Sequence, residues 1–156
     1  MDWFARMIYG ALVWKERQRA KAGQEPGRNR DPEGKKEHLK TGSRGETLAY
    51  WYLRQAGYVI IARNRRPHFR RGELDMIGWD GSILAFIEVK TRTGEQAGPP
   101  ETAVSRRQQK RIIHSAQEYM KRLKRKPLGY RFDIAGVRWD PAAGYKVHVV
   151  KDAYKV

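Results

Sequence analysis

The sequence contains no cysteine in its 156 residues. This absence excludes disulfides, zinc–thiolate sites and thiol nucleophiles, and it fits a reducing cytoplasm. Long hydrophobic runs are absent as well. The most apolar N-terminal stretch spans residues 3–14 and is interrupted by Arg6, whereas a membrane-spanning helix needs about 20 apolar residues. Asp2 also stands where a signal peptide carries positive charge. We therefore expect a cytoplasmic protein without a transmembrane segment.

Acidic side chains are scarce relative to basic ones. The chain has 33 lysines and arginines against 17 aspartates and glutamates, which gives a formal net charge of +16. A chain of this length suits one domain plus an extension. Such an excess of positive charge in a small protein favours a polyanionic partner, either nucleic acid or an anionic membrane surface.

The chain divides into three segments. Residues 1–21 form an amphipathic helical extension, because apolar side chains such as Trp3, Met7 and Ala11 recur at helical spacing. This helix binds a membrane surface or a partner, or it packs on its own domain or a second subunit; packing on protein is the commoner use. Residues 22–42 are rich in glycine, proline and charge, which predicts a flexible linker. The folded domain is expected at residues 43–156.

The domain alternates helical and strand patterns. A helix is predicted from Ser43, with Glu46 at capping-box spacing, to a stop at Gly57. A second helix is predicted to begin at Ser105, with Gln108 at the same spacing. Strands are predicted at residues 58–66, 72–79, 82–92, 130–139 and 144–156, with a hairpin turn at Asp80-Gly81. This order predicts an α/β domain built on a mixed central sheet.

Charged residues end the most apolar strand. Glu88 and Lys90 are two apart and therefore share a face, and the hairpin brings Asp75 of the preceding strand beside them. Two close carboxylates repel each other unless a cation or a proton lies between them. Oxygen ligands suit Mg²⁺ or Mn²⁺, and a lysine beside such an ion can orient water or stabilise phosphate charge. A structural Glu88–Lys90 ion pair is the alternative, but buried ion pairs contribute little net stability.

The same residues carry a family resemblance. Asp75 followed by Glu88-Val89-Lys90 resembles the PD-(D/E)xK nuclease motif. More narrowly, residues 42–66, 70–81, 86–94 and 103–111 resemble the YraN-like family of bacterial proteins, grouped with Holliday-junction-resolvase-like endonucleases. The resemblance runs from about Lys35 to the C-terminus. It implies a restriction-endonuclease-like mixed sheet flanked by helices and Mg²⁺-dependent cleavage of DNA phosphodiesters.

The resemblance also implies roles for individual residues. Asp75 and Glu88 would be metal ligands, Lys90 the catalytic lysine, and Glu46 a further acidic residue of the site. Glu46 as a helix cap is the alternative for that residue. Gln108 departs from the pattern, since relatives usually carry lysine there, and glutamine adds no charge.

Two neighbouring acids receive no catalytic role. Glu73 is expected to be a solvated or supporting charge beside the site. Asp133 lies in an apolar strand and is expected to pair with an arginine.

Two basic clusters bracket the proposed site in the chain. A solvated face is the ordinary explanation of such clusters, yet arginine and lysine also supply most sequence-independent affinity for phosphates. We therefore expect branched or duplex DNA, recognised by shape, as the partner. A dimer is expected if two strands are cut symmetrically. A non-catalytic nucleic-acid-binding protein on the same fold is the alternative. The nucleic-acid-binding candidates are Arg63, Arg65, Arg66, Arg70, Arg71, Arg106, Arg107, Lys110 and Arg111.

Overall fold

The computed structural model describes residues 2–22, 34–65, 73–92, 98–140 and 144–156. Its helices are α1 (Trp3–Lys21), α2 (Gly34–Gln55) and α3 (Arg106–Lys121), with a short 3-10 helix, η1 (Pro100–Ala103). Its strands are β1 (Val59–Arg65), β2 (Leu74–Asp80), β3 (Ile83–Arg92), β4 (Gly129–Asp140) and β5 (Gly144–Tyr154). The predicted α/β class and the predicted order of elements are confirmed.

The five strands form one sheet in the order β1-β2-β3-β4-β5. β3 and β4 are parallel, and the other neighbouring pairs are antiparallel, so the sheet is mixed as predicted. The hairpin between β2 and β3 closes at Asp80 and Ile83, and Gly81 takes a φ of 61° in the turn, a conformation that glycine adopts without a Cβ clash.

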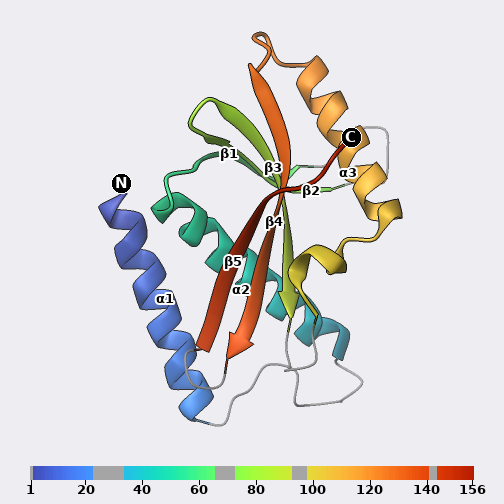
Figure 1. Cartoon of the computed structure of the whole chain (residues 1–156). Helices are drawn as coiled ribbons and strands as arrows, with labels where there is room; N and C mark the ends of the chain where they lie inside the picture. The colour runs from blue at the N-terminus through green and yellow to red at the C-terminus, as the bar shows by residue number, and fades with distance from the viewer. Residues whose placement is uncertain (1, 23–33, 66–72, 93–97, 141–143) are drawn as a thin grey trace.

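Helices cover both faces of the sheet. α1 and α2 lie on one side and α3 lies on the other (Figure 1). Because side chains alternate along β3, Ala85 and Ile87 enter the core beneath α2, while Leu84 and Phe86 enter the core beneath α3. Burial on both faces explains why β3 is a nearly continuous apolar run.

The start of α2 corrects one expectation. The helix begins at Gly34, so residues 34–42 are helical instead of belonging to a linker, and Ser43 and Glu46 lie inside the helix. The predicted capping box at Ser43 is therefore wrong. A cap is identified from a few neighbouring residues, whereas the helix continues past it in the N-terminal direction.

The N-terminal helix packs on its own domain. Ala5 is fully buried, and Tyr9, Leu12 and Val13 pack against the core beneath α2. Tyr9 meets Tyr52 of α2 edge-on, with ring centroids 5.5 Å apart. Among the described residues, no helix is long and apolar enough to cross a membrane. α1 is thus a third covering helix of the fold.

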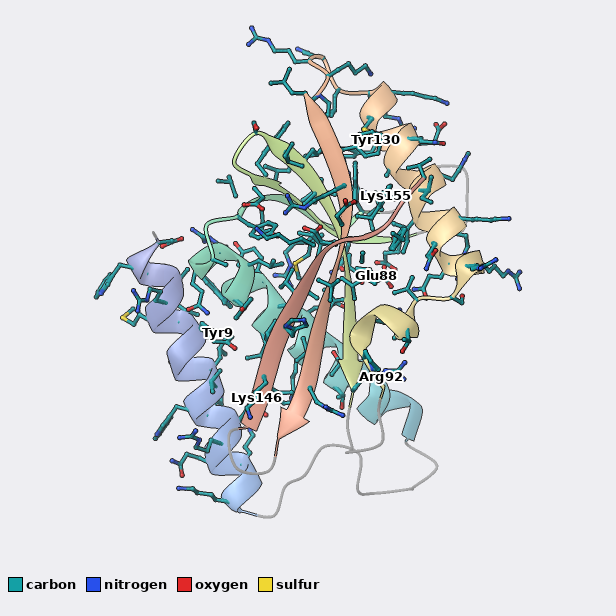
Figure 2. All side chains as sticks on the ribbon, in the orientation of Figure 1. Tyr9, Glu88, Arg92, Tyr130, Lys146 and Lys155 are labelled. Carbon is teal, nitrogen blue, oxygen red and sulfur yellow. The ribbon has the colours of Figure 1, made fainter. Side chains whose placement is uncertain are left out.

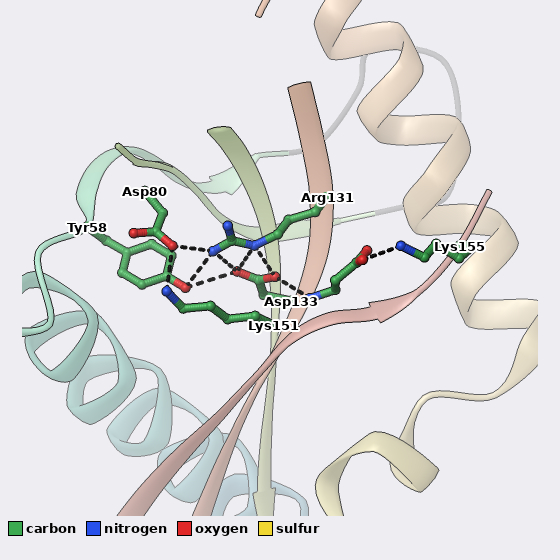
Figure 3. A network of polar contacts seen from close by, with 7 residues as sticks. Tyr58, Asp80, Arg131, Asp133, Lys151 and Lys155 are labelled. Carbon is green, nitrogen blue, oxygen red and sulfur yellow. Dashed lines mark hydrogen bonds and ion pairs between the residues drawn. The ribbon is translucent and has the colours of Figure 1, made fainter. Parts of the chain in front are cut away.

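A polar network joins the turn end of the β2–β3 hairpin to β4 and β5 (Figure 3). Arg131 Nε donates to Asp133 Oδ1 at 2.8 Å, and Tyr58 Oη donates to Asp133 Oδ2 at 3.0 Å. Arg131 also pairs with Asp80, which Lys151 contacts from β5. Asp133 is fully buried, and its pairing with an arginine is as predicted. Its oxygens are used for structure, because a buried carboxylate needs such partners.

Candidate active site

The site forms where β2 and β3 separate. Their ladder ends at the Met76–Ile87 pair. Beyond it, Asp75 Oδ2 accepts a hydrogen bond from the backbone N–H of Val89 at 2.8 Å. The Asp75 side chain thus takes a strand N–H that would otherwise lack a partner in a buried position. This contact fixes Asp75 beside the residues that follow Ile87.

Glu88 lies on the α3 side of the sheet. It is 6% exposed, and Figure 2 places it between the sheet and the N-terminal end of α3. Its Oε1 accepts from Lys90 Nζ at 2.8 Å and from Gln108 Nε2 at 2.5 Å. Glu88 and Lys90 therefore point the same way, as strand alternation requires, while Val89 packs in the core of the other face.

Gln108 has a role that the sequence did not indicate. Ser105 caps α3 as predicted, since its Oγ accepts from the Gln108 backbone N–H at 3.2 Å. The Gln108 side chain does not complete a capping box; it reaches across to β3 and holds Glu88. A lysine at this position would add a second cation, whereas the Gln108 amide orients Glu88 without neutralising it.

The carboxylates of the site repel one another. The pKa of Asp75 is raised from 3.8 to about 7: burial is the largest cause, the charges of Glu88 and Glu46 add to it, and the Val89 N–H and Lys90 oppose the rise. One lysine therefore compensates three acids only in part. With all three acids ionised the site would hold more negative charge than its own residues neutralise, so Asp75 keeps its proton to a higher pH than usual.

Glu46 comes to the site through a close helix–strand approach. Gly45 lies against Thr91 of β3, and a Cβ at position 45 would stand 1.8 Å from Thr91 Oγ1. Only glycine permits this approach, which brings the half-buried Glu46 near enough to influence Asp75. The sequence signal that could have indicated this contact is a glycine inside a helical pattern.

The donor set suits a hard divalent ion better than zinc. Within the described parts of the chain, no three acidic or histidine side chains are grouped closely enough to enclose a metal by themselves. Mg²⁺, however, keeps several waters and binds through one or two carboxylates plus substrate phosphates. Asp75 Oδ1 and Glu88 Oε2 accept no hydrogen bond from the described residues. The buried Glu88 and the half-buried Asp75, which repel each other, therefore fit such an ion.

Tyr154 is another residue that sequence reasoning missed. Its ring stacks on Phe132, with centroids 5.1 Å apart. Its hydroxyl is buried and has no hydrogen-bond partner within the described residues. Burial raises the pKa of Tyr154, and so do the charges of Glu88 and Asp133. The buried Tyr154 hydroxyl is therefore close enough to interact electrostatically with Glu88, although no sequence motif indicated it.

The predicted basic residues lie in different places. Arg106, Arg107, Lys110 and Arg111 are exposed in the first turns of α3, the helix that carries Gln108. Arg65 is exposed at the end of β1, and Arg63 stacks on the Tyr50 ring at 4.7 Å. Arg66, Arg70 and Arg71 lie outside the described residues. The α3 cluster is thus on the helix whose Gln108 contacts Glu88, and Arg65 is paired in the sheet with Leu74, next to Asp75.

Trp79 packs against the core beneath α3. Glu73 is half-buried directly before β2; its supporting role stays a prediction.

Comparisons with known proteins agree on one family. Residues 45–137 match the model of uncharacterised protein family UPF0102. A UPF0102 protein of Koribacter versatilis is 47% identical over 104 residues, covering 67% of this chain and 72% of the relative. A UPF0102 protein of Symbiobacterium thermophilum is 40% identical over 115 residues, covering 74% and 96%. The matched range contains α2 from Gly45, β2, β3 and most of β4, and with them all the site residues described above except Tyr154.

Proposed function

The chain belongs to the UPF0102 family of YraN-like proteins, and on that basis we propose that it is a metal-dependent, structure-selective endonuclease that hydrolyses DNA phosphodiester bonds. The observation that carries the proposal is the convergence of Asp75, Glu88 and Lys90 where β2 and β3 part, in surroundings that raise the pKa of Asp75. A purely structural Glu88–Lys90 ion pair would not need Asp75 as a second acid beside it.

Each residue has a separate task in this proposal. Asp75 and Glu88 would hold Mg²⁺ or Mn²⁺, which when bound supplies Lewis acidity and a more acidic water. Lys90 Nζ, already beside Glu88, would stabilise charge on the phosphate that is attacked. Gln108 would keep Glu88 oriented, and the negative charge of Glu46 would favour the binding of a cation.

The wider setting is also a proposal. The net charge of +16 and the exposed basic turns of α3 support a nucleic-acid partner bound through its phosphates. We expect branched or duplex DNA, a cytoplasmic location, and a twofold dimer if both strands of a junction are cut.

The test is a cleavage assay with matched carboxylate-to-amide variants. Wild type, Asp75→Asn and Glu88→Gln are incubated with a four-way junction, linear duplex, single-stranded DNA and RNA, in Mg²⁺, Mn²⁺ or EDTA. Glu118→Gln serves as the control, because this acid is on α3 and pairs only with exposed Lys121 among the described residues. We expect metal-dependent cleavage in wild type and control alone. Binding without cleavage by wild type on every substrate would instead support the non-catalytic alternative.

A further inference from the structure

The outward side of α1 is apolar although its inward side is already packed. Trp3, Met7 and Trp14 are 73%, 47% and 63% exposed. At about 100° per residue these three side chains fall on one stripe, opposite the buried Ala5 and its neighbours. We call this stripe (Trp3, Met7, Trp14) the outer face of α1. The hydrophobic periodicity in the N-terminal sequence thus serves two faces, and the fold uses one of them.

Exposed basic side chains border the outer face. Lys15 and Arg17 flank it on its two sides, and Lys21 continues its line at the C-terminal end. The acids of this region are engaged elsewhere. Asp2 pairs with Arg54 of α2 at 2.6 Å, and the buried Glu16 pairs with Arg19 at 2.7 Å. The outer face therefore combines large apolar groups with positive charge.

This combination selects among the surfaces that could cover it. A second copy would bring another net charge of +16 against the same basic border. Nucleic acid would neutralise the charge but offers no continuous apolar layer along a helix. The boundary between headgroups and acyl chains of an anionic bilayer offers both at once.

We propose that α1 is a peripheral membrane anchor that lays its outer face on an anionic lipid surface while its inner face stays on the domain. Tryptophan and basic side chains are the residues that interfacial helices use in this way. α1 and α3 lie on opposite sides of the molecule (Figure 1). A bound membrane therefore leaves the basic turns of α3 and the site beside them accessible.

The test uses vesicle binding by the full chain. Vesicles of phosphatidylcholine mixed with phosphatidylglycerol are compared with pure phosphatidylcholine at physiological salt. Three proteins are titrated: wild type, Trp3→Gln/Met7→Gln/Trp14→Gln, and a control, Lys121→Gln/Lys124→Gln/Arg125→Gln, which removes three exposed charges far from α1. We expect wild type to bind only the anionic vesicles. The triple-glutamine variant of the outer face should bind them at least about tenfold more weakly, and the affinity of the control should fall by less than about threefold.

Two further measurements test lipid contact and self-association separately. Brominated phospholipids should quench the tryptophan fluorescence of the wild-type protein in anionic vesicles, a readout that needs no mutation. In sedimentation velocity without lipid, wild type and the triple-glutamine variant should have the same sedimentation coefficient. Equal vesicle binding by wild type and the triple-glutamine variant, or absence of quenching, would overturn the proposed membrane anchor. Self-association of wild type that the triple-glutamine variant abolishes would instead assign the outer face to a second copy.

Discussion

Asp75 is the residue where burial and like charge act in the same direction. Its carboxyl lies beside Glu88, under the influence of Glu46, and its pKa rises to about 7. A raised pKa means that the folded protein holds a proton which the unfolded chain has already lost. The same proton is the one that a divalent ion would displace, so metal affinity should increase as pH rises through 7.

The first prediction concerns stability without metal. The unfolding free energy of wild type should fall as pH rises from about 4 to about 7, by up to about 4 kcal/mol, because ionising Asp75 is harder in the folded state. Asp75→Asn should lose this decline, as measured by urea unfolding in EDTA across that pH range.

The matched control is Asp80→Asn, the same chemical change at a different site. Hydrogen bonds from Lys151 and Arg131 lower the pKa of Asp80. Asp80 therefore stabilises the fold above its unfolded pKa, and this contribution disappears as pH falls. The two variants should differ from wild type with opposite pH trends. An unchanged pH profile for Asp75→Asn would refute the raised pKa.

Lys90 should matter for chemistry more than for affinity. Lys90→Met should slow single-turnover cleavage by about two to three decades, since a well-placed electrostatic group acts on the transition state. DNA affinity should change by less than about threefold, because one charge among 33 basic residues adds little to binding. Lys110→Met, on exposed α3, is the control. Like Lys90→Met it should change DNA affinity by less than about threefold, but it should leave the rate at saturating enzyme intact. Weaker binding with an unchanged rate for Lys90→Met would make Lys90 a binding residue.

At the scale of elements, the site depends on how closely α2 approaches β3. The two meet at Gly45 and Thr91, and this contact sets the position of Glu46. Gly45→Ala should therefore destabilise the protein by about 1–3 kcal/mol, because the helix or the threonine must move. Thermal or urea unfolding measures the loss.

A double-mutant cycle identifies the cause. Thr91→Ala removes the Oγ1 atom that a Cβ at position 45 would meet at 1.8 Å, and leaves Thr91 Cβ at 3.0 Å. The double variant should recover part of the stability lost by Gly45→Ala. Gly42→Ala is the control, since a Cβ there meets nothing within 4 Å. Additive losses in the cycle would mean that the contact does not control the helix position.

At the scale of the whole molecule, positive charge is the dominant property. The exposed residues Arg106, Arg107, Lys110 and Arg111 stand in the turns of α3 that adjoin Gln108. If DNA lies there, replacing all four with glutamine should lower the log–log salt slope of binding by about 0.9 per lost phosphate contact. Fluorescence anisotropy at several salt concentrations gives the slope.

A fourfold change at the other end of α3 controls for net charge. Lys121, Arg122, Lys124 and Arg125 are also exposed, and replacing them with glutamine removes the same charge. The slope should change less than with the N-terminal cluster. Equal effects would indicate that the whole surface attracts DNA without a defined track.

Much of the fold could be predicted because its signals are local. Alternation in Ile83–Arg92 fixed Glu88 and Lys90 to one face, the Asp80-Gly81 turn fixed the hairpin, and Ser105 fixed the start of α3. Each of these depends on residues within a few positions of one another. The family motif added the expected partnership of Asp75 with Glu88.

The sequence by itself determined the α/β class, the order of elements, the positive charge and the identity of the acidic residues. Only the tertiary structure decided which distant groups contact the acidic residues, namely the Gln108 amide at Glu88 and the Val89 N–H at Asp75. It also decided that Gly45 lies against Thr91, which places Glu46. It also gave α1 one packed face and one exposed face. Periodicity records which side chains share a surface, but contacts between elements depend on their packing distance and angle, and these follow from the whole core being filled at once.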